Sequence, residues 1–337
     1  MQNERKDSKE WLKIISKYNK PDAKKSIWQI VNSVGPYLLL WGLMYFSLQI
    51  SYLLTLGLSI VAAGFLVRIF IIFHDCGHGS FFRSKKTNKI IGTILGSMVF
   101  TPYDRWHKDH HIHHNTVGNL DKRGVGDVWT LTVAEYEALS RGEKLYYRVY
   151  RNPIILLILA PVILFVIWFR FPNKSLGRPE RISVYISNLI IAGFTAGLIL
   201  LMGLKAFLMI QLPIIYVATT GGVWLFYVQH QFEDTIWTRQ EAWDYKTMAL
   251  EGSSYLEFPR LLQWFSGNIG FHHIHHLSPK IPNYNLEKCH RENAMFESIK
   301  PVRFLSSMRT INLRLWDESK AKLISFRDLR RASASVA

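Results

Sequence analysis

The sequence predicts an all-α integral membrane protein with about four full transmembrane helices, further re-entrant or interfacial helices, and a cytosolic helical cap that carries histidine-rich motifs. Two observations lead to this fold class. Hydrophobic residues make up 49% of the 337 residues and gather in long runs. All 13 histidines fall in the polar blocks that separate or flank those runs.

Four of the apolar runs are long enough to cross a bilayer, because its hydrocarbon core requires about 20 residues of helix. These runs are residues 31–49, 52–73, 184–203 and 206–228. Two shorter runs, 89–103 and 153–169, are marginal for a crossing, and Pro161 interrupts the second. We therefore predict that these two segments are re-entrant or lie along the membrane interface.

Basic residues predict the orientation, since Lys and Arg collect on the cytoplasmic side of membrane proteins. Residues 1–25 form a basic arm that is too long and too charged for a signal peptide, so the arm and the histidine-bearing blocks are expected in the cytosol. The basic loop 170–183 stays cytosolic only if 153–169 enters and leaves by the same face. The predicted organisation is an arm (1–25), a membrane domain (26–300) and a basic cytosolic tail (301–337).

The formal net charge of +16 has a membrane explanation. Basic residues on the cytoplasmic side attract anionic lipid headgroups, and no base-reading motif accompanies them, so we expect no nucleic-acid partner. The same charge would attract an acidic soluble protein. Cys76 and Cys289 are the only cysteines and form no pairing pattern, which excludes a disulfide scaffold.

Three histidine motifs stand out in the polar blocks. The first reads HDCGH and contributes His74 and His78. The other two follow the pattern HxxHH and contribute His110, His113 and His114, and His272, His275 and His276. Residues three and four apart lie on one face of a helix, so each motif presents two or three imidazoles together.

Eight histidines in patterned groups indicate metal binding. A single histidine in such a block would be a plain polar residue, but packed imidazoles without a ligand would repel one another or stay unsatisfied. Neutral imidazole suits iron, zinc, copper and nickel. Because eight or nine imidazoles exceed what one ion can coordinate, the count predicts two metals.

The order of these motifs resembles the membrane fatty acid desaturase family. An HxxxH motif follows the second apolar run, one HxxHH motif comes at residues 110–114, and another follows the last run. The stretches GVWLFYVQHQFED, EGSS and LLQWFSGNIGFHHIHHLSPKIPNYNL are similar to bacterial acyl-lipid delta-5 desaturases in particular. The resemblance extends from about residue 26 to about residue 325.

The resemblance implies an oxygen-dependent enzyme of the plasma membrane that introduces a cis double bond, at the delta-5 position, into saturated acyl chains of membrane phospholipids. It implies two Fe ions held by the eight motif histidines, O2 as co-substrate, and no catalytic residue beyond the metal centre. His230, at the cytosolic end of the last run, is implied as a further ligand. From the residues alone, a capping or interfacial role at a helix end is a serious alternative for His230.

Other residues near the motifs are weaker candidates. Asn268 precedes His272 by four residues, so on a helix it would share a face and could contact a metal through water, with a plain polar position as an equal alternative. Four carboxylates are candidates to orient imidazoles or are solvated surface charges: Asp75, Asp109, Asp127 and Asp234. Five aromatic residues would line an apolar substrate channel or anchor the protein at headgroup level: Tyr103, Trp106, Trp129, Trp224 and Phe271.

Electrons for this chemistry must come from another protein. The chain shows no His-Pro-Gly-Gly haem stretch, no cysteine cluster and no GxGxxG fingerprint. The resemblance implies a soluble ferredoxin or a flavodoxin-like donor. Two alternatives remain: a membrane hydroxylase or related lipid-modifying oxygenase, and a His-rich metal transporter. The transporter is disfavoured because the crossing runs hold no Asp, Glu or His except near their ends.

Overall fold

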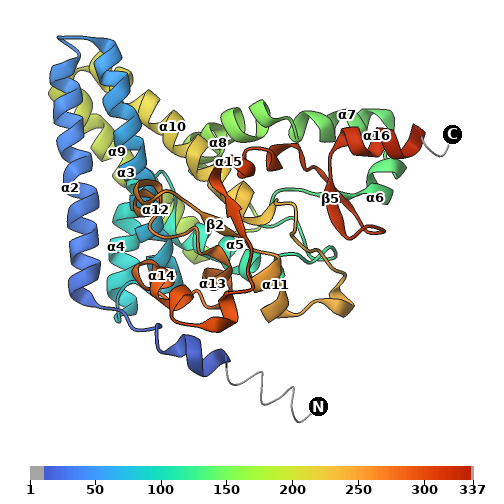
Figure 1. Cartoon of the computed structure of the whole chain (residues 1–337). Coiled ribbons are helices and arrows are strands. Elements are labelled where there is room, and N and C mark those ends of the chain that lie inside the picture. Colours follow the sequence, from blue (N-terminus) through green and yellow to red (C-terminus); the bar gives the residue numbers. More distant parts are fainter. Residues whose placement is uncertain (1–10, 335–337) are drawn as a thin grey trace.

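The computed structural model describes residues 11–334 of the chain. The first ten residues of the predicted basic arm and the last three of the tail lie outside the described residues. Figure 1 shows a bundle of long helices on one side of the molecule and a smaller lobe, which contains the C-terminal helix, on the other. Short helices and loops join the two parts.

The four predicted membrane crossings are confirmed as four long apolar helices. They are α2 (Ala23–Ser47), α3 (Tyr52–His78), α9 (Arg178–Met202) and α10 (Leu204–His230). α2 and α3 form an antiparallel pair. Asp22 caps the start of α2, because its carboxylate accepts hydrogen bonds from backbone N–H groups in the first turn of the helix. α3 and α10 extend past their apolar runs, and their last turns carry His74, His78 and His230.

Two shorter helices, α4 (Lys85–Met98) and α5 (Tyr103–Thr116), pack against the C-terminal half of α3. Ser84 caps α4 by accepting a hydrogen bond from the N–H of Thr87. The two helices approach closely at Gly92, where a Cβ atom would collide with the Tyr103 ring. The Tyr103 hydroxyl donates to the carbonyl of Cys76 at 2.7 Å. This contact fixes α5, the helix of the second histidine motif, against the end of α3.

The segment predicted to be re-entrant is a bent and irregular helix. α7 (Arg141–Tyr150) is followed after a 51° bend by η1 (Ile154–Leu159), α8 (Ala160–Val162), η2 (Ile163–Ile167) and η3 (Trp168–Arg170). η1 and η2 are π-helical. Pro161 lies between them, and because proline lacks an N–H group it cannot continue the ordinary hydrogen-bond ladder of an α-helix.

Both ends of this segment are held by buried arginines. Arg151, at its beginning, donates hydrogen bonds to Gln231 Oε1 at 3.0 Å and to the carbonyl of Leu313 at 2.8 Å. At its far end, Arg105 of α5 donates to the carbonyls of Trp168 at 3.2 Å and Phe171 at 3.0 Å. The segment therefore starts beside the end of α10 and finishes beside the histidine helix α5.

The remaining elements form the cap. Its helices are α6 (Val133–Ala138), η4 (Gln240–Ala242), α11 (Tyr245–Glu251), α12 (Arg260–Phe265), α13 (His272–Leu277), α14 (Asn283–Arg291), η5 (Ala294–Phe296), α15 (Phe304–Ser307), η6 (Thr310–Asn312) and α16 (Phe326–Ala334). Its strands are β1 (Leu131–Thr132), β2 (Tyr255–Glu257), β3 (Pro301–Arg303), β4 (Leu315–Asp317) and β5 (Lys322–Ile324). β4 pairs in parallel with β1 and antiparallel with β5, and β2 pairs in parallel with β3. The all-α class is confirmed, and the short strands are additions that the sequence did not predict.

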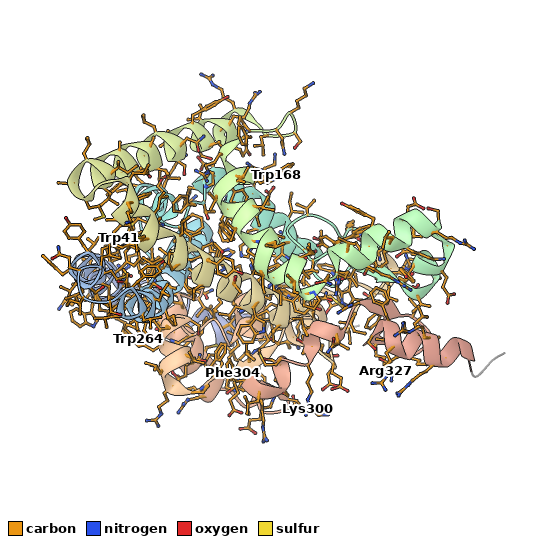
Figure 2. The ribbon with its side chains drawn as sticks, turned by 90° about the horizontal axis from the view of Figure 1, so that it is seen from above. Trp41, Trp168, Trp264, Lys300, Phe304 and Arg327 are labelled. Carbon is orange, nitrogen blue, oxygen red and sulfur yellow. The ribbon has the colours of Figure 1, made fainter. Side chains whose placement is uncertain are left out.

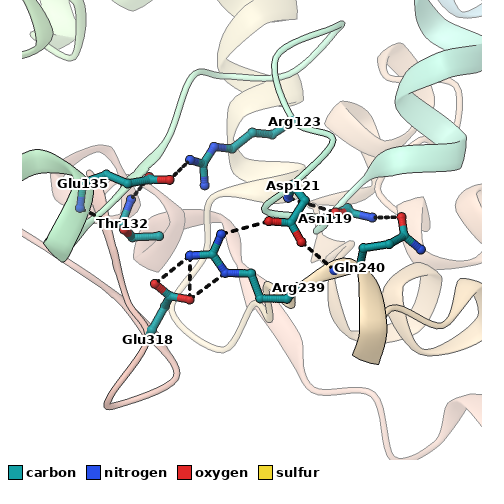
Figure 3. A network of polar contacts seen from close by, with 8 residues as sticks. All are labelled: Asn119, Asp121, Arg123, Thr132, Glu135, Arg239, Gln240 and Glu318. Carbon is teal, nitrogen blue, oxygen red and sulfur yellow. Dashed lines mark hydrogen bonds and ion pairs between the residues drawn. The ribbon is translucent and has the colours of Figure 1, made fainter.

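Surface ion pairs connect the parts of the C-terminal lobe. Arg239 contacts the carboxylates of Asp121 at 2.9 Å and Glu318 at 3.0 Å, and the Asp121 carboxylate also accepts from the N–H of Gln240 (Figure 3). The three charged side chains are each at least 39% exposed, so the network contributes little to stability. It joins the loop after α5, the loop after α10 and the β4–β5 hairpin. Figure 2 places Arg327 of this lobe far from Trp41 of α2 and Trp264 of α12.

Candidate metal centre

The fold brings the three histidine motifs and His230 to one place. The HDCGH motif forms the end of α3, the first HxxHH motif lies in α5, and the second forms α13. His230 is the last residue of α10. Eight of these nine side chains are buried, and His78 is half-buried.

The nine imidazoles separate into two groups, each with ligand atoms within 4.8 Å of one another. The first group is His74, His78, His110, His114 and His275, and the second is His113, His230, His272 and His276. Each HxxHH motif contributes to both groups. The two groups are therefore neighbours, because α5 and α13 both reach across them.

The spacing of the ring nitrogens fits metal ligation. The Nε2 atom of His110 lies 3.0 Å from that of His74 and 3.1 Å from that of His114. In the second group, Nε2 of His230 lies 3.1 Å from that of His113 and 3.0 Å from that of His272. Two imidazole nitrogens bound at right angles to one ion, each at about 2.1 Å, are separated by about 3.0 Å. The observed separations match those expected for nitrogens bound to one ion.

Protonation and hydrogen bonding also favour ligation. Burial lowers the pKa of His110, His114, His272, His275 and His276 well below the usual imidazole range, with a smaller contribution from neighbouring imidazoles in each case. These rings are therefore neutral at pH 7 and keep a lone pair for a metal. The buried Nε2 atom of His276 has no hydrogen-bond partner within the protein, which leaves it available as a ligand.

Three of the imidazoles are oriented through their other nitrogen. Nδ1 of His113 donates to Asp127 Oδ1 at 2.5 Å, and Nδ1 of His74 lies 3.2 Å from Asp75 Oδ1. Nδ1 of His230 donates to the carbonyl of Gly252 at 3.2 Å. Each contact places the proton on Nδ1 and leaves the Nε2 lone pair toward the group. For His230, the structure favours a place in the second group over an isolated role at a helix end.

Two of the four candidate carboxylates make these contacts. Asp75 and Asp127 touch imidazoles of the two groups, whereas Asp234 is exposed and Asp109 makes no hydrogen bond to a group member. Asp75 also accepts from the backbone N–H of Asn283 at 2.7 Å and from its side-chain amide at 2.9 Å. Neither Asn283 nor Gly252 stood out in the sequence, because the segments that carry them become neighbours of the motifs only after folding.

The helical argument for Asn268 is wrong. Residues 266–270 form turns and α13 begins only at His272, so Asn268 and His272 do not share a helix face. Asn268 has a positive φ of 60°, and its side-chain amide donates to the carbonyl of Asn283 at 3.2 Å. The residue shapes the turn that leads into α13.

The five candidate channel residues do not come together. Tyr103 and Trp106 belong to the core between α3, α4 and α5, Phe271 to the core beside α13, Trp224 to the cluster at the end of α10, and Trp129 to the C-terminal lobe. Trp106 is the member nearest the histidines, stacked on His110 with ring centroids 4.3 Å apart. Phe226 was not among the candidates, yet its ring lies 5.3 Å from that of His113 and 5.4 Å from that of His230.

Comparison with known proteins agrees with this geometry. Residues 50–301 match the model of the family described as fatty acid desaturase. The chain is 47% identical to a fatty acid desaturase of Bacillus subtilis (strain 168), over 97% of this chain and 93% of the relative. The chain belongs to the fatty acid desaturase family. It is a membrane enzyme, an acyl-lipid desaturase that acts as an oxidoreductase.

More distant members of the desaturase family are similar over most of the chain. An sn-1 acyl-lipid omega-3 desaturase (ferredoxin) of Nostoc sp. (strain 36) is 30% identical over 74% of this chain and 69% of its own length. An sn-1 oleoyl-lipid 12-desaturase of Picosynechococcus sp. is 27% identical over 67% of this chain and 65% of its own length. The names of these relatives differ in double-bond position, so the family match by itself assigns no position to this desaturase.

Proposed function

We propose that this desaturase uses two Fe ions and O2 to introduce a cis double bond, at the delta-5 position, into saturated acyl chains of phospholipids in the plasma membrane. The observation that carries the proposal is the pair of adjacent groups of five and four imidazoles, eight of them buried, at the C-terminal ends of α3 and α10. Neutral imidazole is a suitable ligand for iron.

The first group would hold one iron and the second group the other. These residues would hold the iron, which would supply the O2 chemistry needed to desaturate an unreactive methylene pair. In balance, the acyl chain gives two hydrogens, a donor gives two electrons, two protons come from solvent, and O2 becomes two waters. The chain's own contribution is to keep the imidazoles neutral, fix their direction and exclude bulk water.

We infer that the acyl chain is positioned by residues on the side of the two groups that faces the membrane. Trp106 comes one helical turn before His110, and Phe226 comes one turn before His230. Both rings touch group members and neither carries a charge. A saturated chain has no polar handle at the reacting carbons, so contact with such rings and the depth of insertion would decide which carbons face the histidines.

The proposed orientation places both termini and the histidine groups in the cytosol, with residues 26–300 as the membrane domain and the segment 153–169 as a re-entrant element. The basic blocks of the sequence support it through the positive-inside tendency. A soluble ferredoxin or flavodoxin-like protein is proposed as the electron donor. The Nostoc relative, whose name includes ferredoxin, supports this class of donor.

The proposal is tested by expressing the chain in a host that lacks unsaturated lipids and profiling the membrane fatty acids by mass spectrometry. Wild type is expected to yield cis monoenes, and dimethyl disulfide adducts would locate the double bond. His113→Ala is expected to abolish the product and lower bound iron, because it removes a member of the second group. His111→Ala is the matched control, since His111 lies on the same helix but is exposed and belongs to neither group.

Three results would contradict parts of the proposal. Hydroxylated acyl chains in place of monoenes would make the enzyme a hydroxylase. Full activity of metal-free protein would remove the role of the histidine groups. A double bond at another position would leave the desaturase intact and reject delta-5.

A further inference from the structure

The two histidine groups are not equally close to solvent. His78 is half-buried, whereas the other eight members are buried. Electron transfer between proteins weakens steeply with distance, so the place where a group member reaches the surface is the natural entry for electrons. That place is the end of α3, where the chain leaves the membrane region.

Lys280 brings a positive charge beside His78. The ammonium group of Lys280 donates to the carbonyl of His78 at 2.6 Å, and Lys280 is otherwise exposed. Lys280 lies close enough to Lys85 and to His107 for electrostatic interaction with both. The exposed rings of His107 and His111 continue along α5 with centroids 6.3 Å apart.

The positive surface continues into a neighbouring cleft. A cleft of about 700 Å³ lies between the start of α2 and the start of α4, and its lining includes Lys20, Lys24 and Arg83. The one carboxylate in this lining, Asp22, accepts hydrogen bonds from the backbone N–H groups that begin α2. In Figure 1 the start of α2 and helix α14 lie at the same end of the molecule. We define the donor face as Lys20, Lys24, Arg83, Lys85 and Lys280.

A second surface near the histidines, beside α14, is less favourable for an acidic partner protein. Beyond His273, which is fully buried, lies His290, with Nδ1 of His290 3.3 Å from Nε2 of His273. The surface there mixes both signs of charge, since Lys288 and Arg291 of α14 form ion pairs with Glu292, just after the helix, and with Glu287. An acidic protein would find no net attraction at that surface.

We propose that a small acidic electron-transfer protein of the ferredoxin class docks on the donor face and passes electrons to the histidine groups at His78. The proposal rests on the proposed function and adds the location of the partner. Two reduced iron–sulfur proteins are each oxidised by one electron for every double bond formed, and these are the two electrons in the balance above. Opposite charges would steer the encounter and set its orientation, and salt would weaken it.

The test measures binding directly. The detergent-solubilised, iron-loaded enzyme is titrated with an oxidised acidic [2Fe–2S] ferredoxin by surface plasmon resonance, at low and at physiological ionic strength. Arg83→Glu/Lys85→Glu is expected to raise the dissociation constant by about tenfold or more at low salt. The matched control is Arg327→Glu/Arg330→Glu, two exposed arginines of α16 on the opposite lobe, where binding is expected to match wild type. Iron content identical to wild type shows that each variant is folded.

The outcomes separate this proposal from the proposed function. Equal ferredoxin affinity in wild type and Arg83→Glu/Lys85→Glu, or no ferredoxin binding by wild type, would overturn the docking site. Loss of affinity for vesicles with anionic phospholipids, without loss of affinity for ferredoxin, would make the donor face a lipid contact. If wild-type enzyme makes no monoene even with dithionite and methyl viologen as reductant, the proposed function fails whatever the binding result.

Discussion

At the scale of single residues, the contact between His113 and Asp127 is the tightest support of an imidazole. The two atoms are 2.5 Å apart, His113 is fully buried, and the side chain of Asp127 is only 5% exposed. A buried carboxylate on Nδ1 holds the ring in one rotamer and strengthens Nε2 as a ligand. The second group therefore depends on a residue 14 positions along the chain from His113.

Asp127→Asn is expected to weaken iron binding by about 10- to 100-fold while the protein remains folded, because the amide keeps the shape but not the charge of the carboxylate. Iron per protein after dialysis against a graded chelator series measures the effect. Asp234→Asn makes the same chemical change at an exposed carboxylate and is expected to leave iron binding unchanged. Equal iron retention by the two variants would contradict the role given to Asp127.

The sequence predicted the motif histidines because their spacing is local, and it failed where a residue's role depends on distant contacts. Spacing places His110, His113 and His114 on one side of α5, but it cannot say that His113 joins a different group from its neighbours. That division depends on how α13 and α10 approach. The prediction that Asn268 shares a helix face with His272 failed for a related reason, since it assumed a helix where the chain forms turns.

At the scale of elements, the irregular segment Ile154–Arg170, from η1 to η3, has the greatest consequence for topology. Hydropathy allows this segment and α7 together to be a fifth span, and the structure bends by 51° between them. Its two ends contact the ends of α10 and α5, which both carry histidines. Because both ends of the segment contact helices that carry histidines, we infer that the segment enters and leaves the membrane by the same face.

Single-cysteine labelling is expected to place both ends of this segment in the cytosol. Gly142→Cys precedes the segment in an open position, and Lys174→Cys follows it in an exposed loop. Both should react with a membrane-impermeant maleimide in inside-out vesicles and not in intact cells. Cys76 and Cys289 are buried and give little background. Lys205→Cys, in the exposed first turn of α10 beside the connection to α9, is the control and should react only from outside.

Reaction of Gly142→Cys and Lys174→Cys from opposite sides would make the segment a fifth span and would reverse α9 and α10. The sequence could predict the long helices because a crossing needs a long apolar run, which is a local property. It could not predict the π-helical turns beside Pro161 or the short β-strands of the cap. Each strand has only two or three residues and exists because a distant segment, such as β4 for β1, supplies its partner.

At the scale of the whole molecule, the cap places an unusual number of neutral histidines in its interior. Burial lowers the pKa of His110, His114, His272, His275 and His276 well below the usual range, and it lowers the pKa of His273 to about 3. These residues lie on α5 and α13, so protonation at any of them would disturb the packing of one helix against the other. Charge on the histidines therefore couples to the stability of the assembled cap.

The metal-free protein is expected to lose stability as the pH falls below about 6.5. Below this pH the histidines of the unfolded chain take up protons while those of the folded chain do not. The stability that each lowered pKa contributes is therefore fully present above the histidine pKa of the unfolded chain and declines below it. One pH unit below the pKa of the unfolded chain, each such histidine would lower the free energy of unfolding by about 1.4 kcal/mol. Thermal unfolding in detergent between pH 8 and 5.5 should show a constant Tm above pH 7 and a steep fall below 6.5. His273→Gln removes one such group and should make the fall shallower, whereas a Tm independent of pH over this range would mean that the histidines are not buried in the neutral form.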